Sequence, residues 1–335
     1  MSDRDPALVH VRTPTYRRPA LLERSLASLR AQTWPNWVCD VFDDDPDESG
    51  RAVCAALGDA RIRYVANRPQ KFASANIDQC FSTRNPHEAD YFCVLEDDNH
   101  LLPDFLADNI ARARAAGCEV VLRNQLIERA AGTDEARLDT VGVLDDQFVD
   151  GLYAPDAFRL ALIAGIGVSN GGLFWSRRAI SPLEIGHACG ATAQEYMRTF
   201  SLREPILVVM EPAAVWADNG VQTTRDLGDR AGWFRREIDL KRRIRTLQRL
   251  AWLQAAPALR RSYPTSDRFA APPEARVEGL LKALLPAPAG ATVTLRRRLA
   301  LRARGLLIRT VGRLDDDFRA FLKDRAAPPA GRAAV

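Results

Sequence analysis

The sequence predicts an α/β fold in which a mainly parallel central sheet is flanked by helices, followed by a basic helical C-terminal extension. In the first 125 residues, short apolar runs alternate with longer segments of helical periodicity, as a parallel sheet with crossover helices requires. Residues 1–230 carry 24 Lys and Arg against 34 Asp and Glu, a net charge of −10, whereas residues 231–335 carry 23 against 9, a net charge of +14. The two regions therefore present different surfaces.

Composition narrows the class of protein further. With 335 residues, 47% hydrophobic and 27% charged, the chain is able to bury a substantial core. No run approaches the roughly 20 apolar residues that cross a bilayer, and no secretion signal is recognised at the charged start. We therefore expect a cytoplasmic protein, with peripheral contact to the cytoplasmic membrane face as an option. The six cysteines form no CxxC pair, which predicts reduced, buried thiols.

Each expected element follows from its local pattern. Residues 7–13 are predicted to form a strand. Pro19 then begins a helix, because its missing N–H costs nothing in a first turn, and Leu22, Leu26 and Leu29 recur at helical spacing. The same criteria predict further strands at 37–42, 62–66, 91–95 and 119–127, and further helices at 48–57, 72–81 and 103–116.

The second half of the chain is less regular up to about residue 224. It contains a glycine-rich stretch at 165–172 and an apolar strand at 206–210. Beyond it, apolar positions interleaved with Arg and Lys predict a basic amphipathic helix at 233–253 and a further basic helical segment at 294–322.

Two acidic clusters are the clearest sign of chemistry. Asp43, Asp44 and Asp45 directly follow one predicted strand, and the run from Glu96 to Asp98 directly follows another. In a parallel sheet both strand ends lie at the same carboxyl edge, where open α/β folds bind ligands. Converging carboxylates repel one another unless a cation or a hydrogen-bonding ligand joins them. A divalent metal with a phosphate is the simplest occupant; the alternative is two polar turns with Asp as a helix cap.

Three segments carry a resemblance to a known family. They are VRTPTYRRP at 11–19, VFDD at 41–44 and LEDDNHLLP at 95–103. The chain resembles a family 2 glycosyltransferase of the GT-A fold from about residue 7 to residue 224. This resemblance implies a GT-A domain at 1–230, with a nucleotide-sugar half at about 1–127 and an acceptor half at about 128–230, and an extension at 231–335.

The resemblance also implies which residues bind the donor. It places Asp44 on the nucleotide base and Asp97 on the ribose, and it adds further donor contacts from Thr13, Pro14, Tyr16, Lys71 and Asn76. Arg68 is an alternative to Lys71 for the pyrophosphate. Asp98 is the implied ligand of Mn2+ or Mg2+, and Glu96 and Asn219 are further candidates, with Asp218 as the alternative to Asn219.

Two later segments resemble the acceptor side of the family. In SNGGLFW at 169–175, Gly171 and Gly172 are expected to let the backbone approach a sugar, and Trp175 to stack on a pyranose face; the alternative is a packed turn with a core Trp. In QEYMR at 194–198, Glu195 is the implied general base, an ordinary exposed helix Glu being the alternative.

These residues together predict a metal-dependent, inverting glycosyltransferase. It would move a sugar from a nucleoside-diphosphate sugar, with UDP-sugar favoured, to a hydroxyl of a glycan, lipid-linked or small-molecule acceptor, as in polysaccharide biosynthesis. Arg17, Ala75 and Glu195 stand where the family usually has Asn, Arg and Asp. They leave open the alternative of a catalytically weak sugar-nucleotide-binding or membrane-surface protein with the same fold.

The basic extension leaves three interpretations open. It packs on the core as a helical subdomain, it forms a homodimer, or it contacts anionic lipid headgroups through its basic amphipathic helices. Nucleic acid is not an expected partner, because the sequence contains no recognised nucleic-acid-binding motif.

Overall fold

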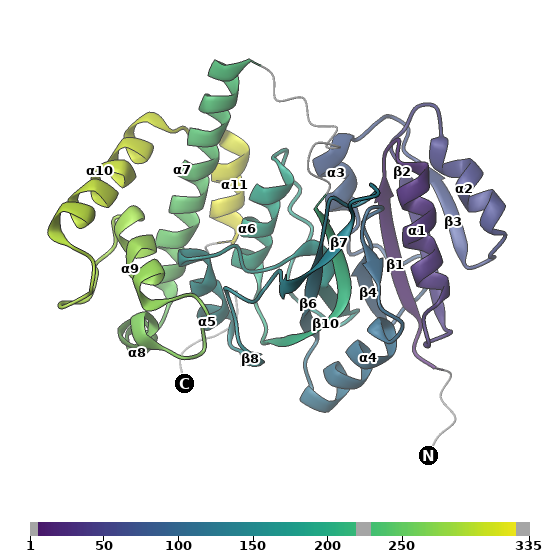
Figure 1. Ribbon diagram of the computed structural model, residues 1–335, viewed down its shortest axis with the longest axis horizontal. Coiled ribbons are helices and arrows are strands. Elements are labelled where there is room, and N and C mark those ends of the chain that lie inside the picture. The colour runs from purple at the N-terminus through teal and green to yellow at the C-terminus, as the bar shows by residue number, and fades with distance from the viewer. Residues whose placement is uncertain (1–5, 219–228, 326–335) are drawn as a thin grey trace.

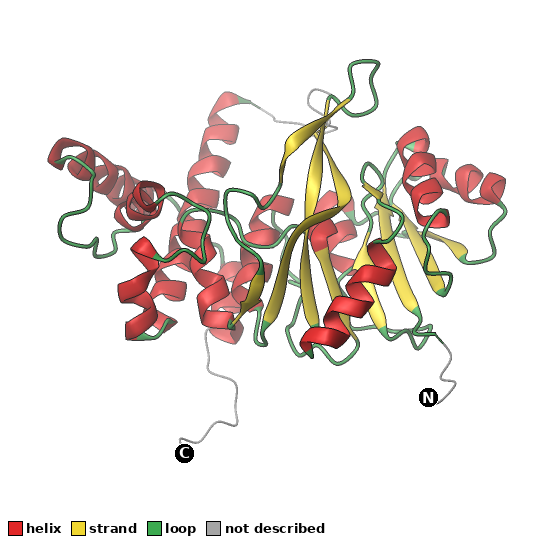
Figure 2. Ribbon diagram, turned by 60° about the horizontal axis from the view of Figure 1, so that its bottom comes forward, coloured by secondary structure: helices red, strands yellow, loops and turns green. Residues whose placement is uncertain are grey.

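The computed structural model describes residues 6–218 and 229–325. Within these ranges the strands form one ten-stranded sheet in the order β3-β2-β1-β4-β9-β6-β10-β5, with β7 paired to β6 and β8 paired to β10. Helices cover the sheet, and the C-terminal helices gather at one end of it (Figures 1 and 2). The predicted α/β class with a helical extension is thereby confirmed.

The first half of the sheet follows the predicted alternation of strand and helix. Its four strands are parallel, in the order β3-β2-β1-β4. They and their connecting helices are β1 (Val9–Thr15), α1 (Pro19–Arg30), β2 (Trp37–Asp43), α2 (Ser49–Leu57), β3 (Ile62–Ala66), α3 (Phe72–Gln79) and β4 (Tyr91–Val94).

The second half of the sheet is mixed. β9 (Leu173–Ser176) runs antiparallel to β4 and to β6 (Val120–Arg129), whereas β10 (Ile206–Asp218) runs parallel to β6. The short strands β5 (His100–Leu101), β7 (Arg137–Gly142) and β8 (Gly151–Tyr153) are antiparallel to their neighbours. The strand predicted at 206–210 continues to Asp218, because the register shift between Val209 and Ala214 lets it bend and go on pairing with β6.

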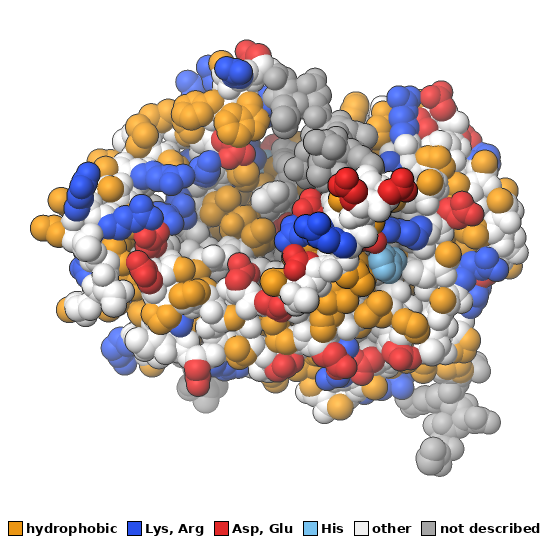
Figure 3. Space-filling model, in the orientation of Figure 1, with side chains coloured by type: hydrophobic (Ala, Val, Ile, Leu, Met, Phe, Trp, Pro, Cys, Tyr) orange, Lys and Arg blue, Asp and Glu red, His pale blue; other side chains and the backbone are white. Residues whose placement is uncertain are grey.

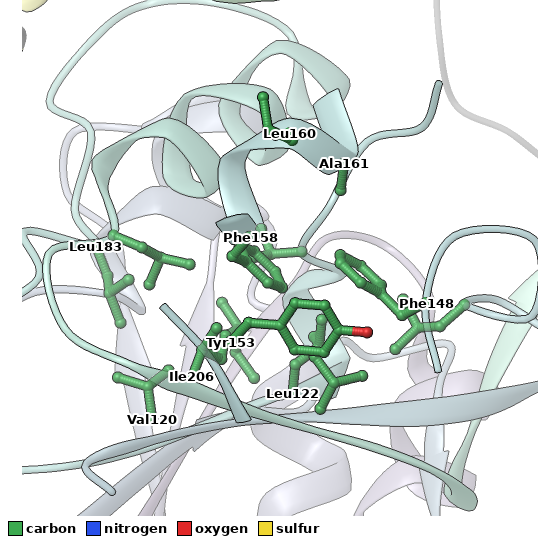
Figure 4. Packing of buried hydrophobic residues seen from close by; sticks show 14 of the residues in the cluster. Val120, Leu122, Phe148, Tyr153, Phe158, Leu160, Ala161, Leu183 and Ile206 are labelled. Carbon is green, nitrogen blue, oxygen red and sulfur yellow. The ribbon is translucent and has the colours of Figure 1, made fainter. Parts of the chain in front are cut away.

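The alternation of side chains along the strands separates two hydrophobic clusters. Cys93 and Val121 face α1 and α4 (Phe105–Ala116). Val94 and Leu122 enter the other cluster, which also takes residues from α5 (Pro155–Arg159) and the 3-10 helix η1 (Leu160–Ile163). Figure 4 shows this second cluster from close by, with side chains of β6 and β10 beside the rings of Phe148, Tyr153 and Phe158.

The basic extension is built on this core. Trp252 of α7 belongs to the same cluster as Leu122, and Leu247 of α7 packs with Met197 of α6 (Ala191–Ser201). The extension therefore shares its hydrophobic core with residues 1–230. Its helices are α7 (Arg230–Gln254), α8 (Pro257–Ser262), α9 (Pro273–Lys282), α10 (Leu295–Val311) and α11 (Asp316–Arg325).

The single helical segment predicted at 294–322 is two helices. The chain leaves α10 at Gly312, where a Cβ would lie 2.7 Å from Cβ of Arg242 on α7. Asp315 then accepts a hydrogen bond from the backbone N–H of Phe318 at 2.7 Å and so caps α11. No helix in the described part of the chain has the length and apolar character needed to span a membrane.

Candidate active site

The carboxyl ends of β1, β2 and β4 bring the two acidic clusters to one edge of the sheet. Thr15, the last residue of β1, pairs with Asp43 of β2, and Arg12 pairs with Val94 of β4. The backbone N–H of Asp44 also donates to the carbonyl oxygen of Thr15 at 3.0 Å. The two clusters therefore lie on either side of the end of β1, as the parallel arrangement predicts.

Glu96, Asp97 and Asp98, here called the acidic motif, are held by the turn that precedes α1. The Thr15 hydroxyl donates to Oδ2 of Asp97 at 2.8 Å. The Arg18 guanidinium pairs with Oδ1 of Asp97 at 2.6 Å and with Oδ2 of Asp98 at 2.7 Å. Arg18 is the N-cap residue of α1, where a cation is unfavourable next to the helix dipole. The two carboxylates compensate for that position.

Asn99 connects the acidic motif to the end of β10. Its Nδ2 donates to Oε2 of Glu96 at 2.8 Å, and its Oδ1 accepts from the backbone N–H of Ala217 at 2.9 Å. Asn99 is buried, so both bonds are shielded from water. Glu96 is thereby oriented by a strand that lies about 120 residues further along the chain.

Burial and crowding raise the pKa of two carboxyl groups in the acidic motif. Burial, followed by the charges of Asp98 and Glu195, raises the pKa of Glu96 to about 8. Burial also raises the pKa of Asp97 to about 7; Arg18 opposes this shift and Asp98 adds to it. A group of buried acids that resists ionisation at neutral pH is stabilised by an added cation.

Glu195, the predicted base, is linked to the acidic motif by packing: the backbone of Asn170 donates to it, and the next residue, Gly171, lies against Asn99, which holds Glu96. Its charge also adds to the raised pKa of Glu96. It is on α6, and its Oε1 accepts from the backbone N–H of Asn170 at 3.4 Å. One turn further along α6, the fully buried Arg198 donates to Oδ1 of Asn170 at 2.7 Å and to Oδ1 of Asp78 at 2.6 Å. This buried network determines where α6 presents Glu195.

The predicted acceptor loop is buried. It forms the 3-10 helix η2 (Asn170–Gly172), in which a Cβ on Gly172 would lie 2.4 Å from the carbonyl oxygen of Arg123. A Cβ on Gly171 would lie 3.2 Å from Nδ2 of Asn99. These glycines therefore let η2 pack against β6 and next to Asn99, and an approach of their backbone to a sugar stays a prediction.

Trp175 is enclosed by the hydrophobic core. It lies on β9, is 6% exposed, and stacks on Phe81 and Phe92 with ring centroids 5.4 Å and 5.8 Å apart. The prediction that Trp175 stacks on a pyranose face is therefore wrong, because the ring is already enclosed by the core. The alternative, a core Trp after a packed turn, describes its place.

The residues predicted to contact the nucleotide are of two kinds. Some bond to the protein's own backbone, and others have exposed side chains. Oδ1 of Asp44 accepts from the backbone N–H of Lys71 at 2.7 Å, and Oδ2 accepts from that of Phe72 at 2.7 Å. Asp44 thus holds the loop before α3, while the Lys71 side chain is exposed. Asn76 is buried and donates to the carbonyl oxygens of Thr15 and Phe42 at 3.3 Å and 3.2 Å.

Two of the predicted donor contacts lie under the surface. The side chain of Thr13 is fully buried, with its Oγ1 3.5 Å from Sγ of Cys39, and Pro14 is buried as well. These two side chains therefore belong to the framework under the site, and a donor contact from either residue stays a prediction. Tyr16 is partly exposed, and its backbone N–H faces Oδ2 of Asp97 at 3.4 Å.

The predicted third metal ligand, Asn219, lies outside the described residues. Its neighbour Asp218 ends β10 and pairs with the Arg129 guanidinium at 2.9 Å. The three carboxylates of the acidic motif do not converge closely in the part of the chain that is described, where one other group of possible ligands does: His10, Asp40 and His87, whose atoms all lie within 4.8 Å of one another.

The hydrogen bonds of this second group indicate a hydrogen-bonded cluster and not a metal site. Oδ2 of Asp40 accepts from Nε2 of both His10 and His87 at 3.0 Å. Each Nδ1 faces an arginine donor, Nε of Arg12 at 3.3 Å and Nη1 of Arg63 at 3.4 Å. A histidine that binds a metal through Nε2 carries its proton on Nδ1, where the arginine donors would oppose it. His10 also lies five residues before the carboxyl end of β1, about 16 Å away from the acidic motif at strand spacing.

Several site residues are missing from the sequence-based prediction. For Arg18 the sequence gives a weak signal: a cation just before a predicted helix needs an acidic partner. Asn99 and the Arg198 network carry no such local signal, because their partners come from distant strands and helices. They become recognisable when the fold is known.

Residues 11–141 match the sequence model of the family described as Glycosyl transferase family 2. The matched residues include the ends of β1, β2 and β4 and the whole acidic motif. The resemblance predicted from the motifs is therefore confirmed over these residues, which are similar to a family 2 glycosyltransferase. A search of curated proteins by sequence finds no match.

Solved structures of TarS from S. aureus have the same fold. The structure of TarS 1-349 has a TM-score of 0.54 at 12% identity and covers 94% of this chain and 90% of its own. The complex of TarS 1-349 with UDP-GlcNAc has the same values, and the complex with UDP has a TM-score of 0.51 at 11% identity. Against a longer TarS chain the match covers half of that chain's length. The GT-A-type fold predicted from the sequence is confirmed.

Proposed function

We propose that this protein transfers a sugar from a nucleoside-diphosphate sugar, with UDP-sugar favoured, to an acceptor hydroxyl with inversion at the anomeric carbon. The observation that carries the proposal is the chain of contacts from Glu195 of α6 through η2 to Asn99, which holds Glu96 of the acidic motif. The match to the family 2 model supports it, as does the similarity in fold to TarS 1-349, which was solved with UDP and with UDP-GlcNAc.

The donor lies along the carboxyl edge of the sheet in this proposal. Asp97 faces the ribose, Asp44 the base, and the exposed Lys71 and partly exposed Tyr16 border the nucleotide. Thr15 keeps this edge in place, because its hydroxyl donates to Asp97 and its carbonyl oxygen accepts from Nδ2 of Asn76.

The acidic motif fits a hard divalent cation such as Mn2+ or Mg2+, because its donors are carboxylate oxygens. Asp98 and Glu96 would hold the ion, with Asn219 as a further candidate. When bound, such an ion stabilises the negative charge of the departing diphosphate. Arg18 now balances Asp97 and Asp98, so its guanidinium must turn away when a cation binds and is then placed to meet the diphosphate.

Glu195 acts as the general base. Its carboxylate accepts the proton of the acceptor hydroxyl while the oxygen attacks the anomeric carbon in line with the bond to the diphosphate. The new C–O bond forms as the old one breaks, and the electron pair of the old bond leaves with the nucleoside diphosphate. The bond from the backbone N–H of Asn170 orients this carboxylate.

Calorimetric titration with UDP, GDP and dTDP, each with and without Mn2+, tests the donor site. We expect Mn2+-dependent binding of one nucleotide, and its loss in Asp98→Ala. If no nucleotide binds with metal present, the donor site is wrong. If Asp98→Ala binds the nucleotide and turns over as the wild type does, the metal assignment is wrong.

The variant Glu195→Gln distinguishes loss of the general base from loss of donor binding. This variant should bind the donor as the wild type does but lose about 100-fold or more in kcat, the usual contribution of a general base. Full activity would move the base elsewhere. Glu195→Asp is the control, because it keeps the carboxylate and should retain part of the activity.

A further inference from the structure

The helix α10 packs on the molecule through one narrow face. Leu301, Gly305 and Ile308 are the buried residues of this helix. At Gly305 a Cβ would lie 2.4 Å from the carbonyl oxygen of Lys282, so α9 and α10 approach closely only because this position is glycine. Figure 1 shows α10 at the outer edge of the molecule, on the side opposite α2.

The other side of α10 is apolar and exposed. At about 100° per residue, Leu295, Leu299 and Leu306 fall within about 40° of one another around the helix, and the stripe widens through Leu307 to Val311. These five side chains are 53% to 73% exposed. Five of the fourteen large exposed hydrophobic residues in the described ranges thus lie on this one helix, too many to be scattered surface positions.

Arginines border this apolar stripe on both sides, and by helical spacing Arg296 lies within it in the first turn of the helix. The helix contains six arginines and no acidic residue. By the same helical spacing, Arg304 lies along one border and Arg309 along the other, and both are exposed. No acidic partner of either guanidinium is found among residues 6–218 and 229–325. In Figure 3, hydrophobic and basic side chains share the edge of the molecule over α10.

We infer that α10 lies in the surface of an anionic lipid bilayer, with its apolar stripe among the acyl chains and its arginines at the headgroups. A helix with an apolar face between rows of Arg has the character of an interfacial helix. The charge favours lipid over a second copy of the chain, because two copies joined through this stripe would bring arginine rows of like sign together. The net charge of +14 on residues 231–335 acts in the same direction.

Flotation of the full chain with lipid vesicles tests the inference, and it needs no sugar donor, so its result is independent of the proposed function. The vesicles are phosphatidylcholine alone and phosphatidylcholine mixed with phosphatidylglycerol, each at low and high salt. We compare the wild type with the double variants Leu299→Ser/Leu306→Ser and Arg304→Gln/Arg309→Gln. The matched control is Ile180→Ser, which removes an equally exposed side chain outside the extension.

We expect the wild type and Ile180→Ser to float with the anionic vesicles, and less so at high salt. Both double variants should bind at least about tenfold more weakly, since a single basic residue near an anionic surface contributes about fivefold. All four side chains are exposed, and circular dichroism verifies that the variants fold.

Three results would overturn the inference. The first is no flotation with anionic vesicles, and the second is flotation that neither double variant reduces. The third is a lipid-free dimer, seen by light scattering, that the Leu299→Ser/Leu306→Ser variant dissociates while vesicle binding is absent. That result would assign the stripe to a second copy of the chain.

Discussion

Arg18 stands before α1 with its guanidinium between Asp97 and Asp98, at 2.6 Å and 2.7 Å. In the proposed metal site Asp98 would also hold the divalent ion, so this ion and Arg18 would share one carboxylate partner. In the absence of metal Arg18 therefore stabilises the acidic motif, and in its presence Arg18 competes. The two roles predict opposite effects of one substitution.

Replacing Arg18 with Met should lower the thermal stability of the metal-free protein and tighten Mn2+ binding. The stability falls because two carboxylates lose their counter-ion, and the Mn2+ affinity rises on the order of tenfold because the competitor is gone. Free Mn2+ measured by electron paramagnetic resonance gives the affinity. Arg17→Met is the control, since Arg17 pairs with Asp45 and Asp47 instead; weaker Mn2+ binding in Arg18→Met than in Arg17→Met would contradict competition.

Glu96 makes the metal-free protein sensitive to pH. Its pKa is raised to about 8 from 4.5, so between these values the folded state keeps a proton that the unfolded chain has lost. The contribution of this group to the free energy of unfolding is fully present below the pKa of the unfolded chain. It is lost as pH rises through the pKa of the folded state. The stability that protonated Glu96 contributes thus falls as pH rises from about 4.5 to about 8 and is gone in alkaline solution.

The substitution Glu96→Gln should stabilise the metal-free protein at about pH 9 and leave its stability unchanged at about pH 5. The gain should be at least about 1.4 kcal/mol, the equivalent of one pKa unit. Chemical denaturation at both pH values measures it. Glu23→Gln, an exposed site on α1, should show no such pH dependence; an equal gain at both pH values would place the effect in packing.

At the scale of the elements, η2 and α6 form one hydrogen-bonded unit that holds Glu195, the proposed base. The backbone of η2 reaches both β6 and Glu195, and Arg198 joins Asn170 of η2 to Asp78 near the end of α3. Because a packed contact transmits small displacements, a change at the contact of η2 with β6 should reach the carboxylate of Glu195, the proposed base.

The variant Gly172→Ala tests this coupling. Its Cβ would approach the carbonyl oxygen of Arg123 to 2.4 Å, and because that atom is backbone, η2 must move. We expect a loss of about 1–3 kcal/mol in unfolding free energy, together with a fall in kcat. Gly190→Ala is the control, since a Cβ there meets nothing within 4 Å. A Gly172→Ala variant with wild-type kcat would show that η2 does not position Glu195.

On the scale of the whole molecule, the extension is part of the core. Trp252 of α7 is 7% exposed and meets Tyr263 edge-to-face at 6.0 Å, within the cluster that contains Val120 and Leu122 of the central sheet. The sheet and the extension should therefore unfold together in one transition, because each covers apolar surface of the other.

Truncating Trp252 to Ala should lower the free energy of unfolding by about 3–5 kcal/mol, as for other buried aromatic residues. Differential scanning calorimetry should show one transition, moved to lower temperature for the whole protein. Leu253→Ala, at an exposed position on the same helix, should change little. Two separate transitions in the wild type or in Trp252→Ala would mean that the extension folds as an independent unit.

The sequence by itself determined the parallel half of the fold and the location of the acidic motif. Alternating apolar runs and helical periodicity are local patterns, and each of β1 to β4 lies close to its predicted range. Acidic residues directly after two parallel strands must meet at one edge, so this convergence also followed from the sequence. The break between α10 and α11 was missed, because Gly312 and Asp315 end and begin helices that a purely periodic pattern joins.

Only the tertiary structure decided which polar residues are framework and which face the site. Thr13, Asn76 and Trp175 have the residue types expected of ligand contacts, and whether they are buried depends on β2, β9 and α3 packing over them. The same holds for Arg18, whose partners lie about 80 residues away, and for the basic extension, whose helices share a core with the sheet while α10 keeps an apolar face exposed. Burial and long-range pairing are properties of the assembled chain, because they arise between segments that no local pattern relates.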